Sequence, residues 1–203
     1  MNQLETSHQR SNSVVEYATF YFDHLSKLLA NLDLQEIAKV IELFEKARDE
    51  GKTVFFIGNG GSAATSSHFA NDLAIGTRSK KLPFRIISLT DNNAVMTAIS
   101  NDFGYDYLFV KQLEAVYREG DLLVAISASG NSQNLINAIE YVKNRKGTTI
   151  GLSGFDGGKL KEMVDYGIHV QTDKGEYGPV EDIHMVLDHV IGTYLMYQCR
   201  KET

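Results

Sequence analysis

Apolar residues recur at helical spacing through most of the first fifty positions. In the segment 14–29 they return every three or four residues, so one face of this segment requires a packing partner. The segment 34–47 carries a second apolar stripe that includes Val40 and Phe44, and Asp33 before it is a suitable N-cap. We predict a helical hairpin that either covers one face of the remaining chain or packs against the same hairpin of another subunit.

From Gly51 onward, short apolar runs alternate with helical patterns. The predicted strands are 53–57, 84–88, 122–126, 148–152 and 166–170, and the predicted helices lie near 62–76, 92–117, 131–146 and 180–199. The strands are apolar on both faces, as in a parallel sheet covered by helices on both sides. This alternation predicts a doubly wound α/β fold, whose ligands bind beyond the carboxyl ends of the strands.

The length of 203 residues fits one domain. We divide the chain into the hairpin, 1–50, and a sheet-containing unit, 51–203, and expect the hairpin to belong to the same folding unit.

Charge and cysteine content narrow the class of partner. The chain has 20 Lys and Arg against 26 Asp and Glu, a net charge of −6, which argues against binding nucleic acid or an anionic membrane. Cys199 is the single cysteine, so a reduced compartment is expected. The N-terminus is polar and no apolar run reaches about 18 residues. We therefore expect a cytoplasmic protein with no nucleic-acid or membrane partner.

The first candidate binding loop directly follows the first predicted strand and reads Asn59-Gly60-Gly61-Ser62. Glycines let the backbone approach a ligand closely, and the N-terminus of the following helix offers free N–H groups to an anion. The loop matches neither a dinucleotide fingerprint nor a nucleoside-triphosphate loop. It fits a small anion or a sugar, although the same glycines also suit a plain tight turn.

A second loop comes after the third predicted strand and reads Ser127-Ala128-Ser129-Gly130-Asn131-Ser132. Three hydroxyls and the open N-terminus of a helix form a neutral phosphate cradle that needs no lysine. One of these serines could also serve as an ordinary helix cap. Two such loops after two strands predict a site for a phosphorylated ligand at one edge of the sheet.

Two histidines and two carboxylates are spaced to form a metal site. His68 and Asp72 lie four residues apart on one helix face, and Glu181 and His189 lie eight apart on the last predicted helix. These side chains are competent ligands for a divalent metal, with zinc the best match by ligand type. The alternative is that both histidines are solvated, and Asp182 and His184 compete as ligands by spacing. Asn101 and Asp102 precede a glycine and suit either sugar hydroxyls or simple loop chemistry.

The order GNGGS, SHFANDL, NDFG and ISASGNS, with a late helix that contains histidine, resembles the phosphoheptose isomerase branch of the sugar isomerase (SIS) domain family. The resemblance runs from about Val14 to Tyr197. It implies a three-layer αβα sandwich with a five-stranded parallel sheet, assembled as a homotetramer with active sites at subunit interfaces. It also implies conversion of sedoheptulose 7-phosphate to D-glycero-D-manno-heptose 7-phosphate through a cis-enediol.

The resemblance assigns roles by position. It places the phosphate on Ser127, Ser129 and Ser132, with Ala128 between them, and the sugar beside Asn59, Gly60, Gly61, Ser62, Asn101, Asp102 and Glu181. It places zinc on His68, Asp72, Glu181 and His189. Asp72 is then the general base and His189 its acid/base partner.

Three positions depart from the family pattern. The family typically has Glu where this chain has Asp72, Gln where it has Glu181, and Thr where it has Ala128. Because Glu181 adds a negative charge while Asp72 is one methylene shorter, we expect the two changes to compensate. The rival functions are isomerisation of a different sugar phosphate and a non-catalytic SIS protein of the DnaA-initiator-associating type.

Overall fold

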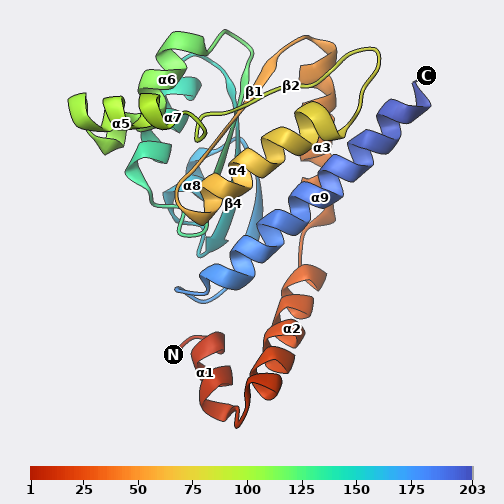
Figure 1. Cartoon of the computed structure of the whole chain (residues 1–203), viewed down its shortest axis with the longest axis vertical. Helices are drawn as coiled ribbons and strands as arrows, with labels where there is room; N and C mark the ends of the chain where they lie inside the picture. The colour runs from red at the N-terminus through yellow and green to blue at the C-terminus, as the bar shows by residue number, and fades with distance from the viewer. Residues whose placement is uncertain (203) are drawn as a thin grey trace.

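A single parallel sheet organises the chain in the computed structural model, which describes residues 1–202. Its five strands are β1 (Thr53–Gly58), β2 (Arg85–Ser88), β3 (Leu122–Ser127), β4 (Thr148–Phe155) and β5 (Tyr166–Gln171). They are all parallel and lie in the order β2-β1-β3-β4-β5 (Figure 1). The strand order reverses between β1 and β3, so a ligand site is expected at the carboxyl ends of these two strands.

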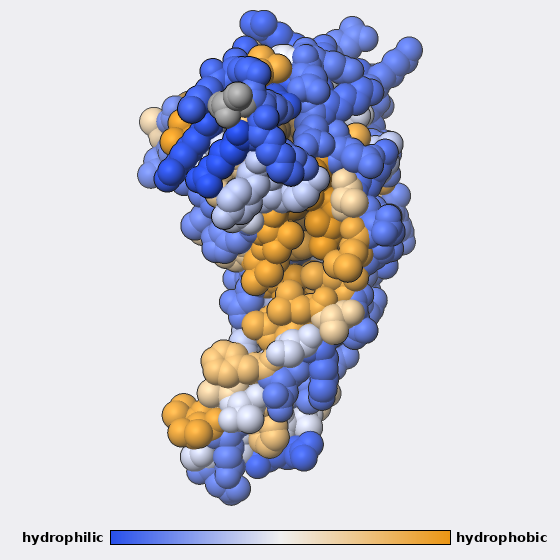
Figure 2. Space-filling view, turned by 90° about the vertical axis from the view of Figure 1, so that its right-hand side faces the viewer, coloured by the Kyte–Doolittle hydropathy of each residue, from blue (hydrophilic) through white to orange (hydrophobic). Residues whose placement is uncertain are grey.

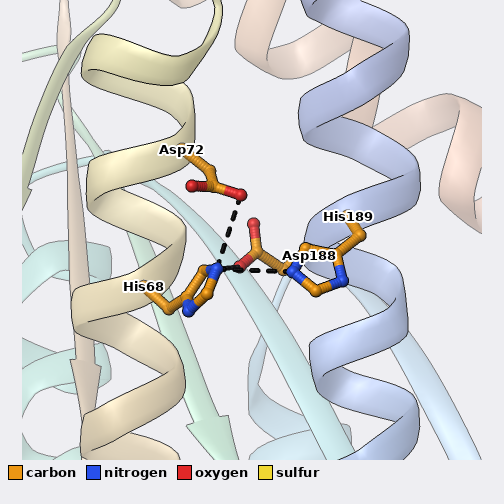
Figure 3. Close-up of side chains that lie close together, drawn as sticks. All are labelled: His68, Asp72, Asp188 and His189. Atoms are coloured by element: carbon orange, nitrogen blue, oxygen red, sulfur yellow. Dashed lines mark hydrogen bonds and ion pairs between the residues drawn. The ribbon is translucent and has the colours of Figure 1, made fainter.

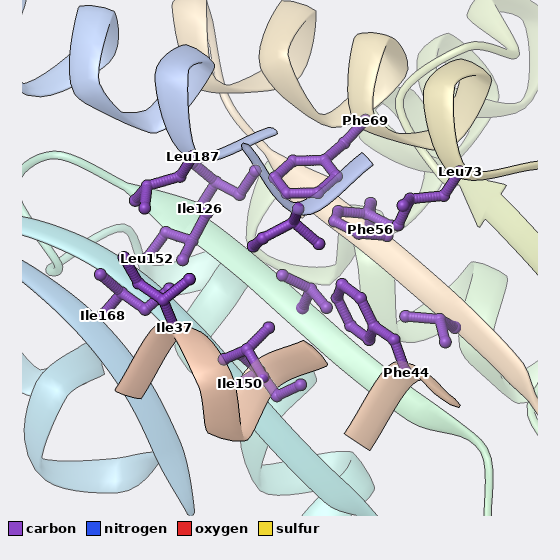
Figure 4. Close-up of a cluster of buried hydrophobic side chains, with 14 of the residues drawn as sticks. Ile37, Phe44, Phe56, Phe69, Leu73, Ile126, Ile150, Leu152, Ile168 and Leu187 are labelled. Carbon is purple, nitrogen blue, oxygen red and sulfur yellow. The ribbon is translucent and has the colours of Figure 1, made fainter. Parts of the chain in front are cut away.

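One face of the sheet is covered by α3 (Leu34–Asp49), α4 (Gly61–Asn71) and α9 (Tyr177–Lys201). Phe44 of α3, Phe69 of α4 and Leu187 of α9 meet the side chains of the strands in one buried cluster (Figure 4). Alternate strand residues point to opposite faces, so Phe56 joins this cluster while Phe55 points to the other face.

The opposite face is covered by α5 (Asn93–Asp102), α6 (Leu108–Val116), α7 (Gln133–Lys143) and α8 (Gly158–Met163). Together the layers form the predicted three-layer αβα sandwich. The single helix predicted at 92–117 is divided into α5, a 3-10 turn and α6, because Gly104 between them has a φ of 92° that no helix accommodates. The short helix α8 was not predicted.

The N-terminal helices are present, but their arrangement differs from a simple hairpin. The helix α2 (Val14–Ala30) extends beyond the sheet beside the short α1 (Gln3–Arg10), while α3 lies on the sheet (Figure 1). The polar α1 begins at a capping box formed by Asn2 and Glu5, a local signal that apolar periodicity does not detect. Whether 1–50 and 51–203 fold as one unit stays a prediction.

Glu176, at the start of α9, ties these helices to the rest of the molecule. Its fully buried carboxylate accepts a hydrogen bond from the Leu4 backbone N–H at 3.2 Å and lies 3.1 Å from His24 Nε2 of α2. The N-terminal helices are therefore held at one end of α9.

Much of the apolar surface of α2 stays uncovered within one chain. This helix buries none of its residues, and Val14, Val15 and Phe22 are exposed. Figure 2 shows a broad apolar area on one face of the molecule, which continues downward onto the N-terminal helices α1 and α2. Within residues 1–202, no helix has the length and apolar content needed to cross a membrane.

The core contains a histidine whose burial makes the stability of the fold depend on pH. His184 of α9 is fully buried; its Nε2 lies 3.4 Å from the Ser153 carbonyl oxygen, and its Nδ1 has no hydrogen-bond partner. Burial lowers the pKa of His184 from 6.5 to about 4, because the charged ring would lose its hydration.

The unfolded chain therefore binds a proton at this histidine between pH 6.5 and 4 that the folded chain does not bind. We expect His184 to remove about 3 kcal/mol of unfolding free energy as the pH falls through this range. Urea unfolding of the wild type and of His184→Gln at pH 7, 5.5 and 4.5 measures this loss. The variant should lose less stability than the wild type, and equal losses in the two chains would refute the assignment.

Candidate functional site

A pocket of about 280 Å³ opens where β1 and β3 end. Both predicted loops meet in it, because the two strands are neighbours in the sheet. Its lining consists of Asn59, Gly60, Gly61, Ser62, Ile126, Ser127, Ala128, Ser129, Ser132, Tyr177 and Glu181. Glu181 is the only charged residue of this lining, so an anionic ligand must be held by neutral donors.

The two helices that begin at the pocket present open N-termini to it. Neither α4 nor α7 has a side-chain cap, so their first backbone N–H groups are available to a ligand. The Ser127 hydroxyl oxygen accepts a hydrogen bond from the Gly130 N–H at 3.1 Å, and that of Ser129 accepts one from the Asn131 N–H at 3.4 Å. Their hydroxyl protons can therefore be donated outward, which is the chemistry that binds a phosphate.

The three asparagine and aspartate positions predicted to line the sugar lie in different surroundings. The Asn59 side chain exchanges hydrogen bonds with Asn134 at 2.9 and 3.0 Å, and Asn59 Oδ1 also accepts one from the Tyr105 hydroxyl at 2.8 Å. These bonds fix the first loop beside α7. Asn101 and Asp102 bond each other at 2.7 Å at the end of α5 and are not part of the pocket lining.

A cluster of two histidines and two aspartates lies between α4 and α9. Figure 3 shows His68, Asp72, Asp188 and His189 pointing toward one another, and one ligand atom from each lies within 4.8 Å of the others. The Nε2 atom of His68 is 3.3 Å from His189 Nε2, 3.5 Å from Asp72 Oδ2 and 3.8 Å from Asp188 Oδ2. The structure thus brings together three of the four predicted metal ligands and adds Asp188.

Glu181 lies outside this cluster. Its carboxylate lies against Gly61 in the pocket described above, which is also lined by the loop 127–132, called the serine loop from here on. Burial, and to a smaller extent the charge of Asp182, raise the pKa of Glu181 above its usual value. The structure therefore places Glu181 among the residues that would contact the ligand, as one of its two predicted roles requires.

Asp72 stands where the helix changes its winding. The α-helix α4 ends at Asn71, and Asp72–Gly76 continue as one π-helical turn. Single π-helical turns inserted in α-helices occur frequently at functional sites. The sequence pattern over 62–76 predicted a continuous helix, because apolar periodicity does not distinguish the two windings over one turn.

Asp188 is the cluster residue that sequence reasoning missed. It is fully buried, and neither of its carboxylate oxygens has a hydrogen-bond partner. Burial, together with the nearby charge of Asp72, raises the pKa of Asp188 to about 7. Its burial could have been inferred from helical spacing. Asp188 lies four positions after His184 and seven before Leu195, and all three residues are on the buried face of α9.

The donor set fits a divalent metal. Two imidazole nitrogens and two carboxylate oxygens converge from two helices, and zinc is commonly held by four such ligands. The two unpartnered oxygens of Asp188 are the observation that favours a cation here, because a buried carboxylate requires a partner.

The pocket and the cluster are connected by the same two helices. His68 lies seven positions after Gly61 on α4, and His189 lies eight after Glu181 on α9, so the two sites are about 10–12 Å apart along the helices. A single extended ligand with an anionic group at one end can bridge this distance. The anionic end of such a ligand would occupy the serine loop while its other end reached a carboxylate and an imidazole suited to proton transfer.

Comparison with known proteins places the chain in a family. Residues 19–154 match the SIS domain model. The phosphoheptose isomerase of Campylobacter concisus (strain 13826) is 38% identical over 192 residues, covering 94% of this chain and 91% of that protein. The phosphoheptose isomerase of Aneurinibacillus thermoaerophilus is 35% identical over 191 residues, with the same coverage of both chains.

Solved structures agree. The phosphoheptose isomerase from Neisseria gonorrhoeae superposes with a TM-score of 0.80 at 30% identity, covering 90% of this chain and 98% of that one. The phosphoheptose isomerase from Francisella tularensis gives a TM-score of 0.79 at 26% identity, covering 92% and 99%. The SIS domain match, the sequence identity over nearly the full length and the shared fold show that this chain belongs to the phosphoheptose isomerase family of SIS-domain proteins.

Proposed function

We propose that the protein is an aldose–ketose isomerase that converts sedoheptulose 7-phosphate to D-glycero-D-manno-heptose 7-phosphate. The observation that carries this proposal is the pairing of a pocket that offers neutral hydrogen-bond donors to a phosphate with a proton-transfer cluster along α4 and α9. The names of its relatives support a phosphorylated heptose as substrate.

The phosphate is bound by Ser127, Ser129 and Ser132 together with the open N-termini of α4 and α7. These contacts are remote from the reacting carbons, and their binding energy fixes C1 and C2 of the open-chain sugar at the cluster.

Asp72 and His189 carry the proton transfers. Asp72 removes a proton from C1 of the ketose and returns it to C2, while His189 donates a proton to the carbonyl oxygen O2 and accepts the proton of O1. The product is the aldose, with no net gain or loss of protons. The intermediate is a cis-enediol, which is stabilised by hydrogen-bond donors aimed at its oxygens.

The metal in this proposal is one zinc ion per subunit, held by His68, Asp72 and His189 with a fourth carboxylate. When bound, zinc supplies a Lewis acid that polarises the oxygens of the substrate. A carboxylate oxygen of the shorter Asp72 lies within 4.8 Å of a ligand atom of each other member of the cluster.

We also propose a cytoplasmic homotetramer whose N-terminal helical segment, 1–50, folds as one unit with 51–203 and whose active sites lie at subunit interfaces. The exposed apolar residues of α2, together with Val190 on α9, supply a surface that a second copy would cover. Asn101 and Asp102, which lie outside the pocket lining of their own chain, would then contact the sugar from a neighbouring subunit.

The test is to incubate the purified protein with sedoheptulose 7-phosphate, with and without a chelator, and to measure aldoheptose phosphate by chromatography and mass spectrometry. Product formation from the heptulose phosphate, and none from unphosphorylated sedoheptulose, supports the proposal. Turnover only with pentose or hexose phosphates would assign a different substrate, and no turnover with any of them would favour a non-catalytic role.

A further inference from the structure

Asp188 is a buried carboxylate without a hydrogen-bond partner. Its side chain is fully buried in α9, and within residues 1–202 neither carboxylate oxygen meets a hydrogen-bond donor. The nearest charged or polar nitrogen of the cluster, His68 Nε2, lies 3.8 Å away, too far for a hydrogen bond. Burying an ionised carboxylate in this way is costly unless a cation or donors compensate.

The direction of the Asp188 side chain indicates what would stabilise its buried negative charge. Asp188 points toward His68, Asp72 and His189 (Figure 3). Two imidazoles and two carboxylates form a nitrogen-and-oxygen donor set with two negative charges. A dication neutralises both charges, and four donors satisfy the tetrahedral preference of zinc.

We propose that Asp188 is the fourth protein ligand of this metal site and that Glu181 is not a ligand but faces the substrate pocket. The proposal rests on the metal of the proposed function and changes its ligand set. It explains why the chain has an acidic residue on a buried face of α9. It also explains why Glu181, which lies against Gly61, is well placed beside the serine loop without belonging to the cluster.

The first test measures zinc affinity by competition with a colorimetric chelator in the wild type, Asp188→Asn and Glu181→Leu. Leucine is of similar size to glutamate but has no ligand atom, so Glu181→Leu removes every possible metal contact at position 181. Asp188→Asn should weaken zinc binding by at least about 10-fold, the lower end of the loss seen when even an indirect partner of a metal ligand is removed. Glu181→Leu should bind zinc within about threefold of the wild type, since the side chain at position 181 does not contact the metal.

A thermal melt of each variant, with and without zinc, distinguishes an effect of the substitution on folding from an effect on metal binding. Removing an unpartnered buried charge should leave the melting temperature of metal-free Asp188→Asn at or above that of the wild type, while the increase that zinc produces in the wild type becomes smaller. A purely structural role predicts the opposite, a lower melting temperature of the metal-free variant and an unchanged response to zinc.

A spectroscopic test shows directly whether the side chain at position 188 or that at position 181 binds the metal. Cysteine thiolate is a strong ligand for zinc and cobalt, and cobalt bound to thiolate has a charge-transfer absorption that cobalt bound to nitrogen and oxygen lacks. Asp188→Cys loaded with Co²⁺ should gain this absorption. The wild type, whose only thiol is the buried Cys199, and Glu181→Cys should not.

The reversed pattern, with zinc affinity and the cobalt–thiolate absorption tracking position 181, would overturn the proposal and leave the isomerase assignment intact. A wild type that binds neither zinc nor cobalt would also overturn it. Turnover of sedoheptulose 7-phosphate by that metal-free protein, measured separately, decides whether the proposed function survives.

Discussion

Replacing Asp72 with Asn is expected to lower kcat by about 10²–10⁴-fold, the usual contribution of a general base. The amide keeps the shape of the side chain but does not accept the proton from C1. Binding of the sugar phosphate should change by no more than a few fold, because the phosphate contacts lie in the serine loop and not at Asp72. Steady-state kinetics and calorimetric titration with the substrate measure the two quantities.

The control for this variant is Asp49→Asn. Asp49 ends α3, and its carboxylate is largely exposed beside Arg48, so the same chemical change should leave kcat unaffected. If Asp72→Asn turns over substrate at the wild-type rate, the base is a different residue.

The second large effect is expected from Gly130→Ala in the phosphate loop. Gly130 has a φ of 65°, and an added Cβ would lie 1.9 Å from the Gly157 carbonyl oxygen. Because the Leu160 N–H also donates to the Gly130 carbonyl oxygen at 2.9 Å, the loop has little freedom to move away. We expect the free energy of unfolding to fall by about 3 kcal/mol, the sum of left-handed strain and overpacking, and phosphate binding to weaken with it.

Gly51→Ala provides the matched control. Gly51 also has a φ of 65°, but nothing lies within 4 Å of an added Cβ. Its substitution should cost only the strain, about 1 kcal/mol. Denaturant unfolding of both variants separates strain from collision, and equal losses would show that the loop relaxes around the added methyl group.

The sheet and both binding loops could be predicted from sequence because their signals are local. Five apolar runs of strand length predicted the five strands, and glycine or serine clusters at the ends of two of them predicted the pocket. The parallel order of the strands then brings the loops together without further information.

Other features depend on contacts between distant segments. The position of α2, for example, is set by the buried carboxylate of Glu176, which contacts Leu4 of α1 and His24 of α2. Asp188 was missed because helical spacing places Glu181 and His189 on similar sides of α9, and only the approach of α4 decides which carboxylate reaches His68.

We expect one sugar phosphate to extend from the serine loop to the cluster, and a crystal structure of the Asp72→Asn variant with sedoheptulose 7-phosphate would show its position. We expect the phosphate within hydrogen-bond distance of the Ser127, Ser129 and Ser132 hydroxyls, and C1 and C2 beside residue 72 and His189. If the phosphate lies elsewhere, or the first two carbons contact neither of those side chains, the serine loop and the cluster do not form one active site.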